Sequence, residues 1–277
     1  MYTLENCEQL WDEAGRHGTA EERIDRARAW LPYYSYLSAP FLNAPFALPD
    51  DDESFPSFLI REGLVLAGDR VLDIGAGMGG DSLRFAASGA QVTALELSGD
   101  SLEVLRRRAD CLGRKNIEAV QKTWEEFEPS ERFDVSWSSL CPAICSTEEL
   151  RRMEGMTKRL CCLATVTRGS RDKHRKAMMA ELGIRPRGMV TELIHYFNAL
   201  YLMGRQVNVR TRTVLSEYDI PCEKLMEQYP IYFKIFGVPE EKSKAFLEDY
   251  LSRHAENGAL REESVIHLAL LWWKPEA

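Results

Sequence analysis

Residues 71–80 read VLDIGAGMGG and join a short apolar run, a carboxylate and alternating glycines. The apolar run ends in Asp73, and the residues after Gly80 have helical character, so the glycines fall at a sharp turn between strand and helix. Glycines there let backbone N–H groups approach a ligand and open the helix N-terminus toward it. The next apolar run ends in Glu96, where a ribose diol would need an acceptor. The pattern predicts a site for a nucleotide-type cofactor.

The carboxylate of Asp73 discriminates between two cofactor classes. The segment GAGMGG also satisfies the G-x-G-x-x-G pattern of dinucleotide-binding folds. Beside a pyrophosphate, however, a desolvated carboxylate would face further negative charge, which is costly. A cofactor that carries an ammonium and a sulfonium makes the same carboxylate favourable. S-adenosylmethionine (SAM) is such a cofactor, and the sequence favours it over a nicotinamide dinucleotide.

At this point the chain resembles the class I SAM-dependent methyltransferases. Their D-x-G-x-G-x-G motif is matched from Asp73 to Gly79, and their ribose-binding acid is matched at Glu96. The resemblance implies SAM as cofactor and S-adenosylhomocysteine as product. The residues that it implies around the cofactor are Asp73, Gly75, Ala76, Gly77, Gly79, Glu96, Leu97, Thr123, Trp124 and Ser138.

Thr123 departs from the family pattern. The family commonly has an acid at this place to bind the adenine amino group, and this chain has a threonine. Trp124 has two interpretations of equal weight: it covers the adenine, or it packs in the core.

Alternation of strands and helices predicts an α/β fold. Apolar runs separated by helix-length segments indicate a doubly wound, mostly parallel sheet with helices on both faces. The expected strands are 70–74, 91–96, 117–121, 133–137, 161–167, 207–215 and 265–273. The resemblance implies seven strands, the last one antiparallel and inserted between the fifth and the sixth.

The remaining segments predict two additions to this core. Residues 1–57 are expected as an N-terminal extension of helices and loops that caps the substrate, with a helix over 21–31 that stops at Pro32. Residues 58–277 form the expected SAM-binding domain, and 216–264 a helical lid inserted between its last two strands. Further helices are expected over 147–160 and 190–203.

Methyl transfer is an in-line displacement in which the protein mainly holds the nucleophile about 3 Å from the methyl group, in line and dry. Residues 138–144 follow the fourth strand, where the family borders the transferred methyl. They lack the (Asn/Asp)-Pro-Pro-aromatic signature of methylation at amide or base nitrogens. Ser139 and Cys141 are the candidate catalytic residues here. For Cys141, an inert buried thiol is favoured over a nucleophile, because no activating partner is visible.

Four side chains are candidates for contact with the methyl acceptor. Tyr34 belongs to an aromatic stretch of the extension, and Arg168 follows the fifth strand, where it would meet an acidic group. His195 and Asn198 are three residues apart and share a helix face. The histidines show no metal-site spacing.

The composition of the chain limits which methyl acceptor and which cellular compartment we expect. The 277 residues carry a net charge of −8, which weighs against a nucleic-acid substrate and favours a small molecule. We expect no membrane association, because no apolar run has spanning length and no signal peptide is visible. Seven cysteines without framework spacing suggest a reducing cytoplasm.

Three alternatives to methyl transfer remain open from the sequence. One is SAM-dependent transfer of an aminocarboxypropyl group, another is SAM binding without catalysis, and the third is an NAD-dependent oxidoreductase.

Overall fold

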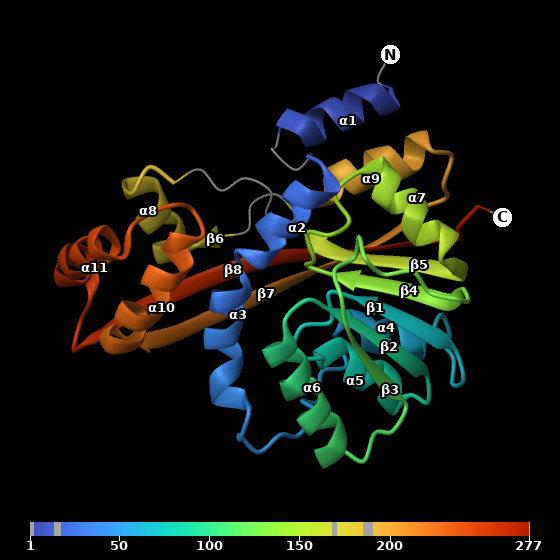
Figure 1. Ribbon diagram of the computed structural model, residues 1–277, viewed down its shortest axis with the longest axis horizontal. Coiled ribbons are helices and arrows are strands. Elements are labelled where there is room, and N and C mark those ends of the chain that lie inside the picture. The colour runs from blue at the N-terminus through green and yellow to red at the C-terminus, as the bar shows by residue number, and fades with distance from the viewer. Residues whose placement is uncertain (1–2, 14–17, 168–170, 185–190, 277) are drawn as a thin grey trace.

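The computed structural model describes residues 3–13, 18–167, 171–184 and 191–276. A single mixed sheet runs through the molecule, and helices cover both of its faces (Figure 1). Its first five strands are parallel and follow the order β3-β2-β1-β4-β5. Their bounds are β1 (Arg70–Ile74), β2 (Gln91–Glu96), β3 (Ile117–Gln121), β4 (Phe133–Ser139) and β5 (Thr157–Val166).

The antiparallel end of the sheet confirms the expected topology. The last strand, β8 (Ala259–Trp273), lies between β5 and β7 (Asn208–Pro221) and runs antiparallel to both. A two-residue strand, β6 (Arg171–Asp172), pairs with the first half of β8 beyond the end of β5. The sheet therefore has the seven expected strands and one short addition.

Alternate residues of the strands point into two separate apolar cores, one on each face of the sheet. Val71 and Cys162 pack with the face covered by α4 (Phe55–Arg61) and α5 (Gly80–Ala87). Their neighbours Leu72 and Cys161 pack with the opposite face. Because successive side chains of a strand point to opposite faces, both faces of a central strand must be apolar, which explains its continuous apolar run.

The opposite face carries α7 (Thr147–Gly155) and α9 (Leu193–Leu202). Helix α6 (Gly99–Cys111) packs beside α5. Helix α7 is shorter than expected, because β5 already begins at Thr157. Within the described residues, no helix combines the length and the apolar character needed to cross a membrane.

The segment predicted as a helical lid is helical only in its middle. Helices α10 (Cys222–Lys234) and α11 (Glu240–His254) fill 222–254. Residues 216–221 and 259–264 instead extend β7 and β8, and Arg261 bonds Glu217 across the two strands at 2.7 Å. Cross-strand pairing therefore continues well beyond the predicted strand ends. The two helices form their own apolar cluster with α8 (Lys173–Glu181).

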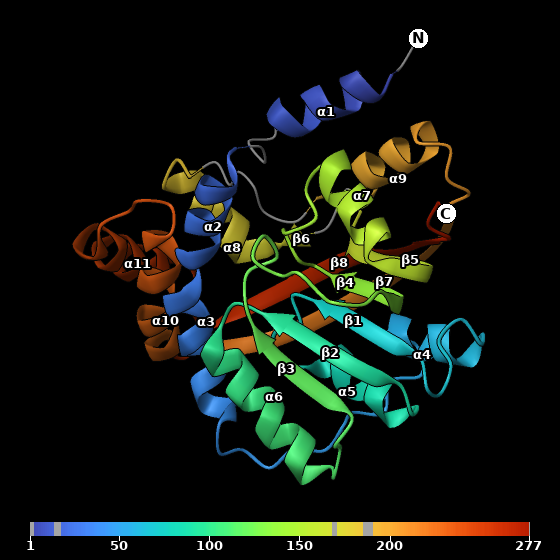
Figure 2. The same cartoon turned by 45° about the vertical axis from the view of Figure 1, so that its right-hand side comes forward.

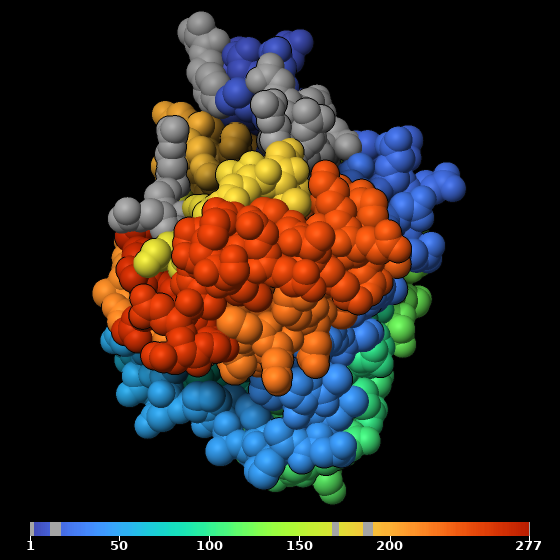
Figure 3. All heavy atoms as spheres, turned by 90° about the vertical axis from the view of Figure 1, so that its left-hand side faces the viewer, coloured from blue at the N-terminus to red at the C-terminus, as the bar shows by residue number. Residues whose placement is uncertain are grey.

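The N-terminal extension is helical, as expected, but differently divided. It contains α1 (Leu4–Glu13), α2 (Ala20–Arg28), α3 (Leu31–Ser38) and the short η1 (Ala39–Phe41). Pro32 lies in the first turn of α3 and does not end a helix. A proline is tolerated there because residues in the first turn of a helix donate no N–H within the helix. Figures 2 and 3 show α2 and α3, in blue, beside the orange helices of the insertion.

Candidate active site

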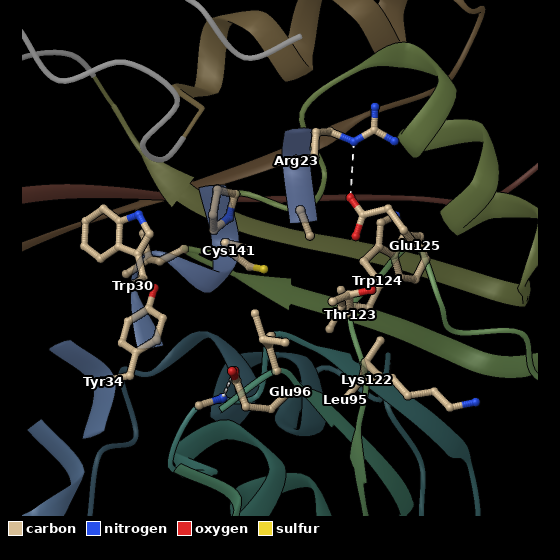
Figure 4. Close-up of a pocket in the computed structure, with 18 of the residues that line it drawn as sticks. Arg23, Trp30, Tyr34, Leu95, Glu96, Lys122, Thr123, Trp124, Glu125 and Cys141 are labelled. Atoms are coloured by element: carbon tan, nitrogen blue, oxygen red, sulfur yellow. Dashed lines mark hydrogen bonds and ion pairs between the residues drawn. The ribbon is translucent and has the colours of Figure 1, made fainter. Parts of the chain in front are cut away.

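A cavity of about 270 Å³ lies at the carboxyl ends of the parallel strands, next to the point where the strand order reverses between β1 and β4. Open α/β sheets bind their ligands at this place. The core contributes residues that follow β1, β2, β3 and β4, and the extension contributes residues of α2 and α3 (Figure 4). The lining residues of the core include Gly75, Gly77, Glu96, Leu97, Thr123, Trp124, Ser139, Leu140, Cys141 and Pro142, and those of the extension are Arg23, Arg26, Ala27, Trp30 and Tyr34.

The glycine turn after β1 fixes one wall of the cavity. Gly79 has a φ of +79°, and a Cβ there would lie 2.0 Å from Cδ1 of Leu105 in α6, so only glycine fits. At Gly77, with a φ of +53°, a Cβ would meet no atom within 4 Å. The turn is thus tightly packed against α6 and open toward the cavity.

Glu96 is held rigidly at the end of β2. Its carboxylate accepts hydrogen bonds from the backbone N–H of Gly77 at 2.9 Å and from that of Ser98 at 2.8 Å. One bond joins β2 to the glycine turn (Figure 4). The other holds Ser98, the N-cap residue of α6. The acid therefore lines the cavity in a fixed orientation, with lone pairs left for a ligand.

Asp73 lies behind the glycine turn and does not line the cavity. It is 2% exposed and accepts a hydrogen bond of 2.5 Å from Oγ of Ser82 in α5. Burial, together with the charge of nearby Asp81, raises the pKa of Asp73 to about 8. Among the described residues no arginine or lysine pairs with it. The site thus holds a buried acid that is mostly protonated at neutral pH and would ionise beside a positively charged ligand.

Asp81, in the first turn of α5, is a second carboxyl near the glycine turn. Its carboxylate accepts the indole N–H of Trp137 at 3.1 Å, and burial raises its pKa. A positively charged group near the turn would therefore be favoured by two carboxyls at once.

Cys141 packs against the glycine turn as a neutral thiol. A Cβ at Gly75 would lie 2.5 Å from its Sγ. Burial, with the nearby charges of Glu96 and Asp73, raises the pKa of Cys141 to about 12. A thiolate is thus absent at neutral pH, which supports the inert interpretation over the nucleophile. Of its neighbours, Ser139 lines the cavity, whereas Ser138 is buried and donates to the carbonyl of Ile74 at 3.3 Å.

Thr123 and Trp124 follow β3 and line the cavity. The N–H and hydroxyl of Thr123 both donate to Glu126, at 3.1 and 2.9 Å, so its own polar groups are already used. Trp124 is 4% exposed and donates its indole N–H to Glu149, and the guanidinium of Arg152 lies 4.5 Å from its ring centre. Trp124 therefore packs in the core and also forms cavity wall.

The four acceptor candidates do not come together. Tyr34 lines the cavity and stacks on Trp30, with ring centres 5.9 Å apart. His195 and Asn198 are not among the lining residues, because α9 packs under α1, where His195 stacks on Trp11 at 6.2 Å. Arg168 lies outside the described residues.

Sequence reasoning missed the contribution of α2. Arg23, Ala27, Trp30 and Tyr34 are spaced by four, three and four residues, which puts them on one helical face, yet the break at Pro32 concealed the continuity. In the described part of the chain no cluster of His, Cys, Asp and Glu could hold a metal ion.

Comparison with known proteins agrees with this geometry. A family model described as a methyltransferase domain matches residues 71–161. Ribosomal RNA small subunit methyltransferase G of Psychromonas ingrahamii is 27% identical over 146 residues, which are 49% of this chain and 66% of that protein. Malonyl-[acyl-carrier protein] O-methyltransferase of Enterobacter lignolyticus is 38% identical over 91 residues, 30% of this chain and 34% of that protein. The chain thus spans less than two thirds of the curated relatives that it matches.

The fold has relatives of known structure. The YcgJ protein of Bacillus subtilis superimposes with a TM-score of 0.53 at 17% identity, over 80% of this chain and 98% of that one. The family match contains the glycine turn, Glu96 and Cys141, and the sheet order and the cavity fit it. Residues 71–161 thus match a methyltransferase domain, and they contain the core part of the cavity wall that follows β1, β2, β3 and β4.

Proposed function

We propose that the chain transfers the methyl group of SAM to a small-molecule acceptor. The observation that carries this proposal is a cavity with two unlike sides. One side is the glycine turn with Glu96, and the other is a roof made by α2 and α3. A cofactor on the first side would present its reactive group to an acceptor held beneath the roof.

The residues of the first side fit SAM. Glu96 has free lone pairs for the ribose hydroxyls, and Gly77 leaves open space beside the turn. Asp73 and Asp81 are two carboxyls near the turn, and the ammonium of the methionine part would favour their ionised forms. When bound, the cofactor supplies an electrophilic methyl on a cationic sulfur. The chain's own residues orient the partners and exclude water, which is the main demand of this displacement.

The roof and the charge of the chain favour a small acceptor. A folded RNA carries dense negative charge and needs an open basic surface, whereas this cavity is covered by helices and the chain has a net charge of −8. The curated relatives act, by their names, on ribosomal RNA and on a malonyl-acyl carrier protein, so both classes belong in the test.

Calorimetry with S-adenosylhomocysteine tests the cofactor, and we expect binding that NAD does not reproduce. Release of S-adenosylhomocysteine is then measured with SAM and a panel of metabolites, with ribosomal RNA and an acyl carrier protein as separate arms. Product mass distinguishes methyl from aminocarboxypropyl transfer. Turnover only with RNA would refute the small-molecule acceptor, and absence of cofactor binding would refute the whole proposal.

A further inference from the structure

Helix α2 covers the cavity but is weakly embedded in the protein. It has no buried residue, although Arg23, Arg26 and Ala27 line the cavity. A capping box closes its first turn, because Thr19 bonds the N–H of Glu22 and Glu22 bonds back. The helix is thus internally stable, and a few side chains hold it on the core.

Arg23 joins the helix to two acids of the core. Its Nε lies 3.2 Å from Glu125, in the loop after β3 (Figure 4). A terminal nitrogen lies 3.1 Å from Glu149, in the first turn of α7. The Arg23 side chain is 21% exposed and that of Glu149 only 4%. Poor access to water makes such a charge-assisted pair stronger than one on the surface.

A second ion pair on the same helix serves as a contrast. Arg28 lies 3.8 Å from Glu126, and both side chains are about half exposed. Pairs of this kind contribute little to stability, because water and salt screen them. Arg28 does not line the cavity.

Glu149 has a second contact on the cavity side. While one oxygen receives Arg23, the other accepts the indole N–H of Trp124, which forms cavity wall. Its own backbone N–H is bonded by Ser146, the N-cap of α7, which fixes the position of the carboxylate. A single buried carboxylate therefore joins the roof helix to the wall.

We propose that Glu149 is a positioning residue that holds Trp124 in the cavity wall and, through Arg23, keeps α2 closed over the bound ligand. Exchange of ligand then requires the Arg23–Glu149 pair to separate. The inference rests on the proposed function only in taking S-adenosylhomocysteine as a ligand of the cavity.

Two substitutions divide the contacts of Glu149. Glu149→Gln keeps a carbonyl oxygen for Trp124 and removes the more deeply buried of the two charges that hold Arg23, whereas Arg23→Gln removes the cation and leaves both acids. Arg28→Gln is the matched control on the same helix. Association and dissociation rates of S-adenosylhomocysteine are measured by stopped-flow tryptophan fluorescence. We expect both rates to rise roughly tenfold in the first two variants, with the Kd within about threefold of wild type, and no change in the control.

Other outcomes overturn the inference. If Arg23→Gln raises only the dissociation rate and weakens the Kd in proportion, Arg23 is a ligand contact and does not close a roof. If its two rates equal those of Arg28→Gln, the pair does not control exchange.

Hydrogen exchange of the α2 amides tests the same idea without ligand. Both variants should exchange faster than wild type and Arg28→Gln, and equal exchange in all four proteins overturns the inference. This measurement decides even if the wild type fails to bind S-adenosylhomocysteine, a result that would refute the proposed function alone.

Discussion

Asp73 combines a raised pKa with a place beside the glycine turn, and the two together determine how it responds to pH. An unfolded aspartate has a pKa of about 3.9, whereas burial raises that of folded Asp73 to about 8. The folded state therefore holds the proton more tightly. The stability that this group contributes is complete below pH about 4 and is lost as the pH rises through about 8.

Substitution of Asp73 should accordingly have opposite effects on stability and on binding. Asp73→Asn removes a buried charge, so we expect a higher urea midpoint than wild type at pH 9 and a smaller difference at pH 5. The same change should weaken binding of S-adenosylhomocysteine roughly tenfold or more, because it removes a buried carboxylate whose charge attracts the ligand ammonium through a medium of low dielectric. Urea unfolding and calorimetry measure the two effects. Equal affinity in both proteins would contradict the role given to Asp73.

Binding of the cofactor should also release a proton from Asp73. A ligand ammonium near the carboxyl lowers its pKa, so at pH 7 a proton leaves as the ligand enters. Calorimetry in buffers of different ionisation enthalpy counts that proton. We expect a fractional release at pH 7 in wild type and none in Asp73→Asn, and the same count in both would show that another group titrates.

At the scale of elements, the glycine turn is braced from the side of α6. Arg108 donates to the carbonyl of Met78 at 3.0 Å, and its guanidinium lies 4.4 Å from the ring centre of Phe46. The neighbouring Arg107 donates hydrogen bonds to Leu42 and Asn43 of the extension instead of to the turn. The two arginines have the same chemistry and different targets.

Removal of the brace should therefore loosen the turn. We expect Arg108→Met to weaken S-adenosylhomocysteine about fivefold to tenfold, from the loss of one hydrogen bond that fixes the turn. Arg107→Met should bind as wild type does. Calorimetry of both variants decides, and equal losses would mean that the extension as a whole, not the turn, had been disturbed.

Elements with a strong local pattern could be predicted from the sequence, and those defined by distant partners could not. The bounds of β1, β2 and β3 agree with prediction. For the central strand β1 the reason is that a strand buried on both faces requires a continuous apolar run. Strands β7 and β8 are longer than predicted, because each is the other's partner over residues that are polar in isolation. The periodicity predicted an apolar face for α9 but not which part of the molecule lies beside it. That neighbour is α1 and not the cavity.

For the whole molecule, the sequence predicted the wall around the glycine turn residue by residue, but it predicted the covering extension only in outline, with Tyr34 and without Arg23 or Trp30. Gly77 and Glu96 belong to one short motif, whereas Arg23 and Trp30 reach the cavity only because the extension folds back across the sheet. No local signal carries that return of the chain. The packing of α9 against α1, which keeps His195 and Asn198 out of the cavity lining, likewise depends on distant parts of the chain.

The last strand depends on a buried ion pair that joins distant parts of the chain. Arg205, just after α9, bonds both oxygens of Glu154 in α7, at 2.7 and 2.9 Å, and Trp273 of β8 donates its indole N–H to the same carboxylate at 2.8 Å. The side chains of Arg205 and Glu154 are 10% and 6% exposed. Loss of one partner leaves a buried charge without compensation, which typically costs about 3–5 kcal/mol.

We therefore expect Arg205→Met to lower the free energy of unfolding by about 3 kcal/mol, near the lower end of that range, because some water reaches the pair. Arg253→Met is the matched control, since Arg253 pairs with Asp249 and Glu181 on the surface, and the free energy of unfolding of this variant should stay close to that of wild type. Urea unfolding followed by tryptophan fluorescence measures both. Equal midpoints for the two variants would contradict this role. The pair that joins β8 to α7 and to the segment just after α9 would then contribute no more to stability than an exposed pair does.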